Sequence, residues 1–169
     1  MTESTSMLTR RGFVIIGRLF VAFILLLMLS VGFWMLNQVL DAVVILGRSY
    51  VDVPGYPAQV SVWVYHDAAY TLLWVSYVGL VLWEITPWKP NQRTVGRVLI
   101  ALFGFALLTA GLWLSQDLMN AVLVLHRPLV DFPFFITSVD WYATRDVIML
   151  LTVLAYIMFY ALIRVSRPE

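Results

Sequence analysis

Few residues of this chain could do chemistry, and its two histidines come first among them. His66 and His126 are the only histidines, and the chain has no cysteine. Two imidazoles that reached one iron could hold a haem through both axial positions. The absence of cysteine excludes disulfides, thiolate metal sites and thiol nucleophiles.

Two matched sets of amides and carboxylates are the second group. Each set occupies positions i, i+1 and i+4, a spacing that places all three side chains toward one side of a helix. Intramembrane carboxylates often mark ion or proton paths. We expect both sets to lie at a polar interface near the outer membrane boundary, where structural hydrogen bonding is the first interpretation and an ion path the alternative. The sets are Asn37, Gln38 and Asp41, and Gln116, Asp117 and Asn120.

The elements that carry these residues are long apolar runs. Apolar residues make up 62% of the 169 residues and charged residues 12%, and the mean hydropathy is +0.87. A run of about 16–18 residues with its flanks crosses a hydrocarbon layer of about 30 Å. We therefore predict an all-α integral membrane protein, one domain over 1–169, with four transmembrane helices. The runs span 19–36, 68–83, 98–115 and 147–163.

The positive charges predict an orientation. Eight of the 11 basic residues flank the inner ends of these runs, and such residues favour the cytoplasmic side. We expect a multi-pass protein of the cell membrane with both termini cytoplasmic and two long loops outside. The Arg10-Arg11 pair resembles a twin-arginine export signal, but the apolar run that follows is too long for one. With a net charge of +1, nucleic-acid binding has no support.

The chain also repeats itself. At an offset of 79, residues 17–77 align with 96–156 without a gap and share 17 of 61 positions, and "GRSYVDVP" at 47–54 matches "HRPLVDFP" at 126–133. Apolar composition alone does not align Arg, Asp, Pro, Gly and Trp together. We interpret the pattern as two tandem helix–loop–helix repeats, about 14–86 and about 93–165, joined by a cytoplasmic linker at about 87–96. Two spans per repeat make the repeats parallel, related by a pseudo-two-fold axis along the membrane normal.

The repeated phrase predicts a corner in each repeat. No proline interrupts 18–46 or 97–125, so each first helix could run for about 43 Å and end above the lipid. An arginine there suits the negative end of the helix dipole, and the proline that follows stops the helix. We expect an aromatic-rich loop of roughly 12 residues, a strand or extended segment near 59–66, an aspartate N-cap on the second helix and an Arg–carboxylate pair. The structural corner residues are Arg48, Asp52, Asp67, Arg127, Asp131 and Asp146.

Helix heights argue against a shared haem. His126 lies 29 residues beyond Arg97, or about 44 Å up a helix, whereas His66 lies near the outer boundary. The repeat aligns His66 with Arg145 and His126 with Gly47, so it does not pair the histidines. His66 and His126 stay weak candidates for cofactor binding. No catalytic residue, metal site or cofactor is predicted, and bound lipid is expected.

The second span of each repeat is rich in aromatic residues. These rings either face lipid or form a docking face for other transmembrane helices. They are Tyr70, Trp74, Tyr77 and Trp83, followed by Tyr156, Phe159 and Tyr160.

The leading hypothesis is a non-catalytic accessory or anchor subunit of a larger membrane complex, with respiratory and related electron-transfer complexes as the first expectation. Its partners would be other transmembrane subunits and an extracytoplasmic domain at the outer loops. The alternatives are a small homo-oligomeric channel or transporter that uses Asp41 and Asp117, and a haem-b or quinone-binding membrane anchor.

Overall fold

Four long helices dominate the computed structural model, which describes residues 2–53, 58–85, 92–131 and 138–166. They are α1 (Thr2–Val44), α2 (Val62–Ile85), α3 (Gln92–Met119) and α4 (Trp141–Ser166), and α3 continues directly into a short π-helix, η1 (Asn120–Val124). Within the described residues, three helices are long and apolar enough to cross a membrane: Val14–Val44, Val95–Val124 and Trp141–Arg164. Helices of this kind are those of a membrane protein.

The distribution of proline explains where the helices end. All seven prolines lie outside the four helices, because proline lacks the N–H that a helix interior needs and its ring clashes with the preceding turn. Long runs of Leu, Val, Ile, Phe and Ala fill the helices instead. Their side chains are apolar around most of the circumference, as in a helix surrounded by lipid or by other helices.

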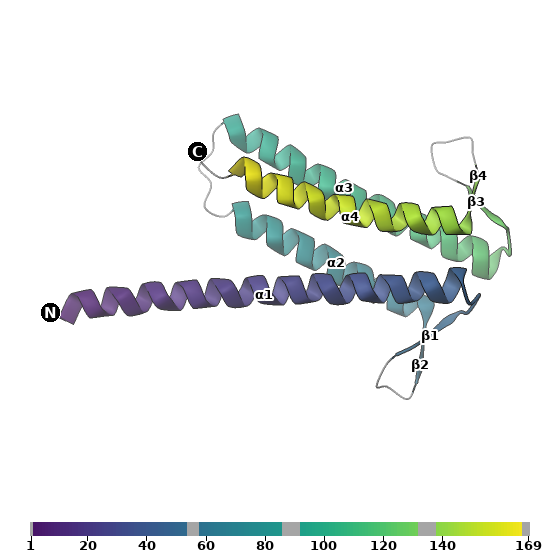
Figure 1. Cartoon of the computed structure of the whole chain (residues 1–169), viewed down its shortest axis with the longest axis horizontal. Coiled ribbons are helices and arrows are strands. Elements are labelled where there is room, and N and C mark those ends of the chain that lie inside the picture. Colours follow the sequence, from purple (N-terminus) through teal and green to yellow (C-terminus); the bar gives the residue numbers. More distant parts are fainter. Residues whose placement is uncertain (1, 54–57, 86–91, 132–137, 167–169) are drawn as a thin grey trace.

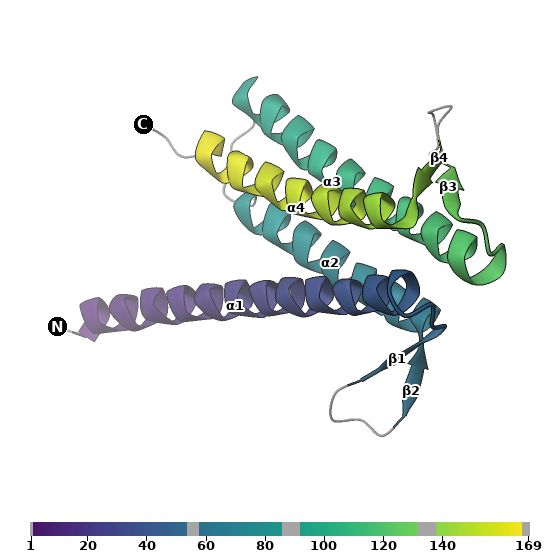
Figure 2. The same ribbon diagram turned by 45° about the vertical axis from the view of Figure 1, so that its right-hand side comes forward.

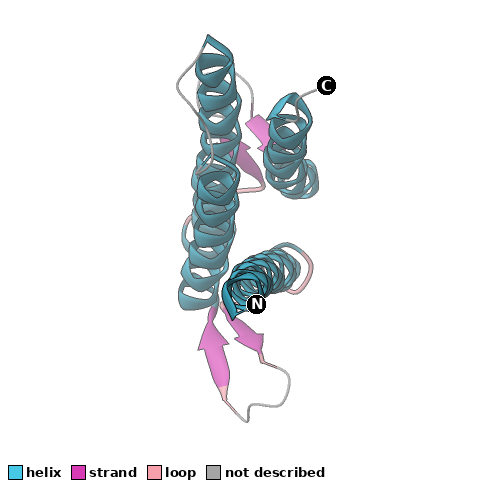
Figure 3. Ribbon diagram, turned by 90° about the vertical axis from the view of Figure 1, so that its left-hand side faces the viewer, coloured by secondary structure: helices cyan, strands magenta, loops and turns pink. Residues whose placement is uncertain are grey.

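The helices pack in two pairs. α1 lies mainly against α2, and α3 mainly against α4. Contacts between these pairs are fewer and involve chiefly α2, which meets α3 and α4 equally. We call α1 and α2 the first pair and α3 and α4 the second pair. Both termini lie at one end of the molecule, and the two connecting hairpins lie at the other (Figures 1 and 2). Figure 3, seen from the end that carries the termini, shows the pairs end on.

Each pair turns through a small antiparallel sheet, of which the sequence predicted only a strand or extended segment near 59–66, and residues 62–66 belong to α2 instead. β1 (Tyr50–Asp52) pairs with β2 (Gln59–Ser61), and β3 (Leu129–Asp131) with β4 (Ser138–Asp140). Every pairing recurs at the offset of 79: Val51 faces Val60 in the first sheet, and Val130 faces Val139 in the second. Because α2 and α4 follow β2 and β4 without a break, the last part of each predicted long loop belongs to a strand or a helix.

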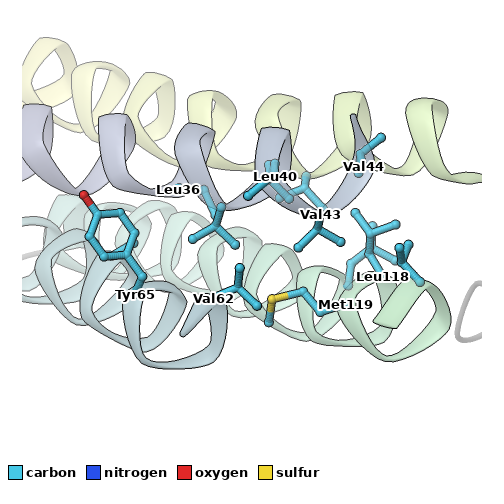
Figure 4. Packing of buried hydrophobic residues seen from close by; sticks show 14 of the residues in the cluster. Leu36, Leu40, Val43, Val44, Val62, Tyr65, Leu118 and Met119 are labelled. Carbon is cyan, nitrogen blue, oxygen red and sulfur yellow. The ribbon is translucent and has the colours of Figure 1, made fainter. Parts of the chain in front are cut away.

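The largest core lies near the corners. Leu36, Leu40 and Val43 of α1 meet Val62 of α2 there, and Leu118 and Met119 of α3 close the cluster (Figure 4). A smaller cluster lies nearer the termini, around Tyr77, Leu108 and Ala155. Between Val14 and Val31, α1 is mostly exposed to its surroundings. The two pairs are therefore held most firmly at the corner end.

Candidate functional site: polar contacts between the helix pairs

An ion pair joins the first helix to the last. Arg145 Nη2 of α4 donates to Asp41 Oδ1 of α1 at 2.6 Å, and both side chains are partly buried, at 25% and 41% exposure. A charge-assisted bond of this length is among the stronger polar contacts in proteins. Asp41 was predicted to lie at a polar interface. Arg145 was missed, because a partner 104 residues away leaves no local signal in the sequence.

His66 makes the second contact between the pairs. Its ring, fully buried in α2, lies with Nε2 2.7 Å from Ser115 Oγ of α3 and with Nδ1 3.1 Å from Asp67 Oδ1. The ring of Tyr70 packs against it at a centroid distance of 4.9 Å. Both imidazole nitrogens therefore have protein partners, and ligation of an iron by His66 would require one of them to be displaced.

The order Asp67–His66–Ser115 matches that of a hydrolase triad, with a carboxylate on Nδ1 and a hydroxyl on Nε2. The arrangement was not predicted, because Ser115 lies 49 residues from His66. Ser115 is completely buried, and its hydroxyl donates to the carbonyl of Leu112 at 2.7 Å. A substrate could reach Ser115 only if the helices separated. Where they stand, these three residues can join α2 to α3 but cannot attack a substrate.

His126 lies in a different environment from His66. It is exposed in the turn after η1 and has a left-handed backbone conformation, with φ at 49°. Its counterpart at the offset of 79 is Gly47, with φ at 59°, so both positions serve the same backbone turn. The amide of the following arginine closes that turn in each repeat: Arg48 donates to the carbonyl of Ala42 at 2.8 Å and Arg127 to that of Ala121 at 2.9 Å. Within the described residues, no group of three or more His, Asp or Glu could hold a metal ion.

Aromatic side chains form a third set of contacts between the pairs. Tyr77 of α2 donates its hydroxyl proton to the carbonyl of Ala101 on α3 at 2.9 Å, and Tyr156 of α4 donates to the carbonyl of Leu73 on α2 at 2.9 Å. The two rings meet edge to face, with centroids 5.7 Å apart. Gly104 makes room for this contact, because a Cβ at that position would overlap the hydroxyl of Tyr77.

This geometry corrects the prediction for the aromatic stripe of α2. Tyr70 and Tyr77 are buried at 1% exposure, so these two rings face neither lipid nor another subunit, whereas Trp74 is half-buried. The two tyrosines pack inside the molecule. On α4, by contrast, Tyr160 is 55% exposed.

The corner arginines lie beside aspartates of the same turn. Arg48 is 3.6 Å from Asp52, and Arg127 is 3.7 Å from Asp131. Asp52 also accepts from Gln59 Nε2 at 3.2 Å, and Asp131 accepts from Ser138 Oγ at 2.9 Å, again at matched positions. All four charged side chains are exposed by 45% or more, so each ion pair contributes less than about 1 kcal/mol to stability.

The N-cap prediction was wrong for both candidate aspartates. Because α2 begins at Val62 and α4 at Trp141, Asp67 and Asp146 each lie in the second turn of their helix. In α4 the capping residue is Asp140, whose Oδ1 accepts from the amide of Ala143 at 3.0 Å. The sequence did not mark where these helices begin, since the last strand residue is followed at once by the first helical one.

A cavity of about 320 Å³ lies at the corner of the second pair. Its polar lining comes from Asp117 of α3, Asn120 of η1, and Arg127 and Asp131 beyond them. Asp117 and Asn120 thus lie together in the lining of this cavity. The other members of the two predicted polar sets, Asn37, Gln38 and Gln116, are half-buried along α1 and α3.

Comparisons with known proteins found nothing similar. No protein-family model matches the chain, and neither curated proteins nor solved structures gave a match.

Proposed function

We propose that this chain is a non-catalytic membrane subunit that anchors a larger membrane complex through an exposed face of α3. Respiratory and related electron-transfer complexes are the first place to look, since they contain many small subunits with several spans. The internal polar groups support a structural role. Asp41, His66, Ser115, Tyr77 and Tyr156 all bond to other parts of the same chain.

All four helices cross the membrane in this proposal. α2 has 24 residues, about 36 Å of helix, which suffices for a span. Its three tyrosines, Tyr65, Tyr70 and Tyr77, are buried inside the molecule. Both termini would be cytoplasmic and both hairpins outside, in agreement with the eight basic residues at the inner ends and with the common end that the termini share (Figure 1).

The proposal includes a duplicated unit, with the repeats related by a two-fold axis along the membrane normal. Contacts that recur at an offset of 79 support it beyond the sequence identity. A Cβ at Gly32 would lie 3.0 Å from the carbonyl of Ala69, and one at Gly111 would lie 3.8 Å from the carbonyl of Ile148. Glycines at equivalent positions thus face equivalent positions of the second helix in both pairs.

The observation that carries the anchoring role is a stripe on α3. Small residues that recur every four positions allow two membrane helices to approach closely, and large side chains on either side then pack around the partner. On α3 two exposed alanines of this spacing are flanked by exposed large residues. The stripe consists of Leu99, Phe103, Ala106, Ala110 and Trp113, whose spacing places them on one side of the helix.

A photo-crosslinking amino acid at Ala110 tests the role in native membranes. We expect one crosslinked partner, an integral membrane protein other than this chain. Val31 is the matched control, because it occupies the equivalent position on α1 and is also exposed, but no small-residue pair surrounds it. Ala110→Trp should lower co-purification of that partner at least tenfold, whereas Val31→Trp should not.

Two results would count against this function. Crosslinking of Ala110 only to a second copy of the chain would favour the homo-oligomeric channel or transporter. The absence of any protein crosslink would leave α3 facing lipid and remove the basis for an anchor. The channel hypothesis itself now depends mainly on Asp117, because Asp41 is already paired with Arg145.

A further inference from the structure

An apolar groove runs between the two pairs on the side where α1 and α4 face each other. Its volume is about 600 Å³, within the range of small-molecule sites. Leu29, Ser30 and Phe33 of α1 line one wall, and Val153, Ile157 and Tyr160 of α4 line the other. Both walls belong to helices that can span a membrane, and toward the termini α1 diverges from α4 (Figures 1 and 2).

The polar atoms inside this groove already have partners. Ser30 Oγ donates to the carbonyl of Leu26 at 2.9 Å, one turn back on its own helix. Tyr156, on the floor, donates to the carbonyl of Leu73 and lies 2.9 Å from Ser76 Oγ. A ligand ring with carbonyl groups would find little to bond here. An alkyl chain, which needs no hydrogen bonds, suits the groove better.

A cation lies at one end of the groove. Arg164 Nε donates to the hydroxyl of Tyr160 at 2.9 Å, and the guanidinium carbon lies 5.4 Å from the centre of that ring. Tyr160 and Arg164 are four positions apart, which is about 6 Å along α4. Arg164 is exposed at the end of the α4 span, so its terminal nitrogens can reach a phosphate at the membrane surface.

We propose that the groove between α1 and α4 holds one acyl chain of an anionic phospholipid, with its phosphate on Arg164. The hydrocarbon chain lies along Phe33, Val153 and Ile157, and Tyr160 holds the guanidinium in place. This inference requires only that α1 and α4 span a membrane. It stands whether or not α3 docks to another subunit.

The test uses the purified full-length chain, stripped of lipid in detergent and offered mixed micelles. These contain equal amounts of phosphatidylglycerol, phosphatidylcholine and an isoprenoid quinone, and native mass spectrometry counts what stays bound. We expect one phosphatidylglycerol per chain. Ile157→Trp, which fills the groove from a half-exposed position, should lower occupancy at least tenfold, and so should Val153→Trp. Val75→Trp, an exposed apolar position on α2 outside the groove, is the control and should change nothing.

Charge selectivity is tested separately. One interfacial arginine favours an anionic headgroup by roughly fivefold, so Arg164→Gln should reduce the preference for phosphatidylglycerol over phosphatidylcholine by about that factor. Arg127→Gln, at the opposite end of the molecule, should leave it unchanged. Equal binding of the two lipids by the unaltered chain, retention of the quinone instead, or unchanged occupancy in both Trp variants would each overturn the proposal.

Discussion

His66 and Arg145 occupy equivalent positions in the two helix pairs, and each reaches across to the first helix of the other pair. His66 of α2 contacts Ser115 of α3, and Arg145 of α4 contacts Asp41 of α1. The positions are equivalent at the offset of 79, although the residue types differ. A basic side chain at this place in the second helix therefore joins each pair to the first helix of the other.

Removal of the Asp41–Arg145 ion pair should weaken the folded state. A double-mutant cycle with Asp41→Ala and Arg145→Ala should give a coupling energy of about 1–2 kcal/mol, since both side chains are partly shielded and in direct contact. Reversible unfolding in detergent measures it. The same cycle on Arg48 and Asp52, which are more exposed and 3.6 Å apart, should give less than about 0.5 kcal/mol. Equal coupling in both cycles would contradict the central role of Arg145.

Loss of the contact between His66 and Ser115 should also destabilise the protein. In Ser115→Ala the buried Nε2 of His66 loses its partner, at a cost of about 1–3 kcal/mol. Thermal unfolding of the purified chain measures the loss. Ser30→Ala is the control, because that hydroxyl is exposed and bonds only to its own helix. If Ser115→Ala were as stable as Ser30→Ala, α2 and α3 would not depend on this bond.

Two buried tyrosines of α2 should respond differently to the loss of their hydroxyls. Tyr77 donates to the carbonyl of Ala101, so Tyr77→Phe should cost about 1 kcal/mol. The hydroxyl of Tyr70 is equally buried and faces Ser115 and Thr152, but it has no partner in hydrogen-bond geometry among the described residues, so Tyr70→Phe should cost less than Tyr77→Phe. The same unfolding assay compares them, and the reverse order would mean that a buried water or another group satisfies Tyr70.

Gly104 should tolerate no larger side chain. Gly104→Leu would push Tyr77 away from Ala101 and open the smaller core, for an expected loss of about 2 kcal/mol or more. The matched control is Gly17→Ala in α1, where no atom lies within 4 Å of a new Cβ and the higher helix propensity of alanine should help slightly. Equal stability of the two variants would show that the helix pairs do not approach at Gly104.

Accessibility should report the proposed orientation. Cysteines introduced at Ser49 and Ser138, both exposed at the corners, should react with an impermeant maleimide in intact cells. A cysteine at Asn91, in the segment between the pairs and outside the described residues, should react only after the membrane is opened. Labelling of position 91 alone would reverse the topology.

Local features of the sequence predicted the helices and the recurrence of the corner. Proline placement and uninterrupted apolar runs are local properties, and they predicted long helices that can cross a membrane. The offset of 79 predicted that 48–52 and 127–131 would be alike, and the two sheets have the same register. The first residue of each helix was harder to predict. An aspartate suits an N-cap at any position, so Asp67 and Asp146 looked as suitable as Asp140.

Which side chains meet across the helix pairs could not be predicted from local patterns. The pairing of Arg145 with Asp41 and of His66 with Ser115 depends on how one helix pair lies against the other, and no local pattern encodes the angle between packed helices. The aromatic stripe of α2 shows the same limit. Its spacing defines one face of a helix, but whether Tyr70 and Tyr77 face lipid, a partner or α3 depends on which neighbour buries that face, and here the second pair does.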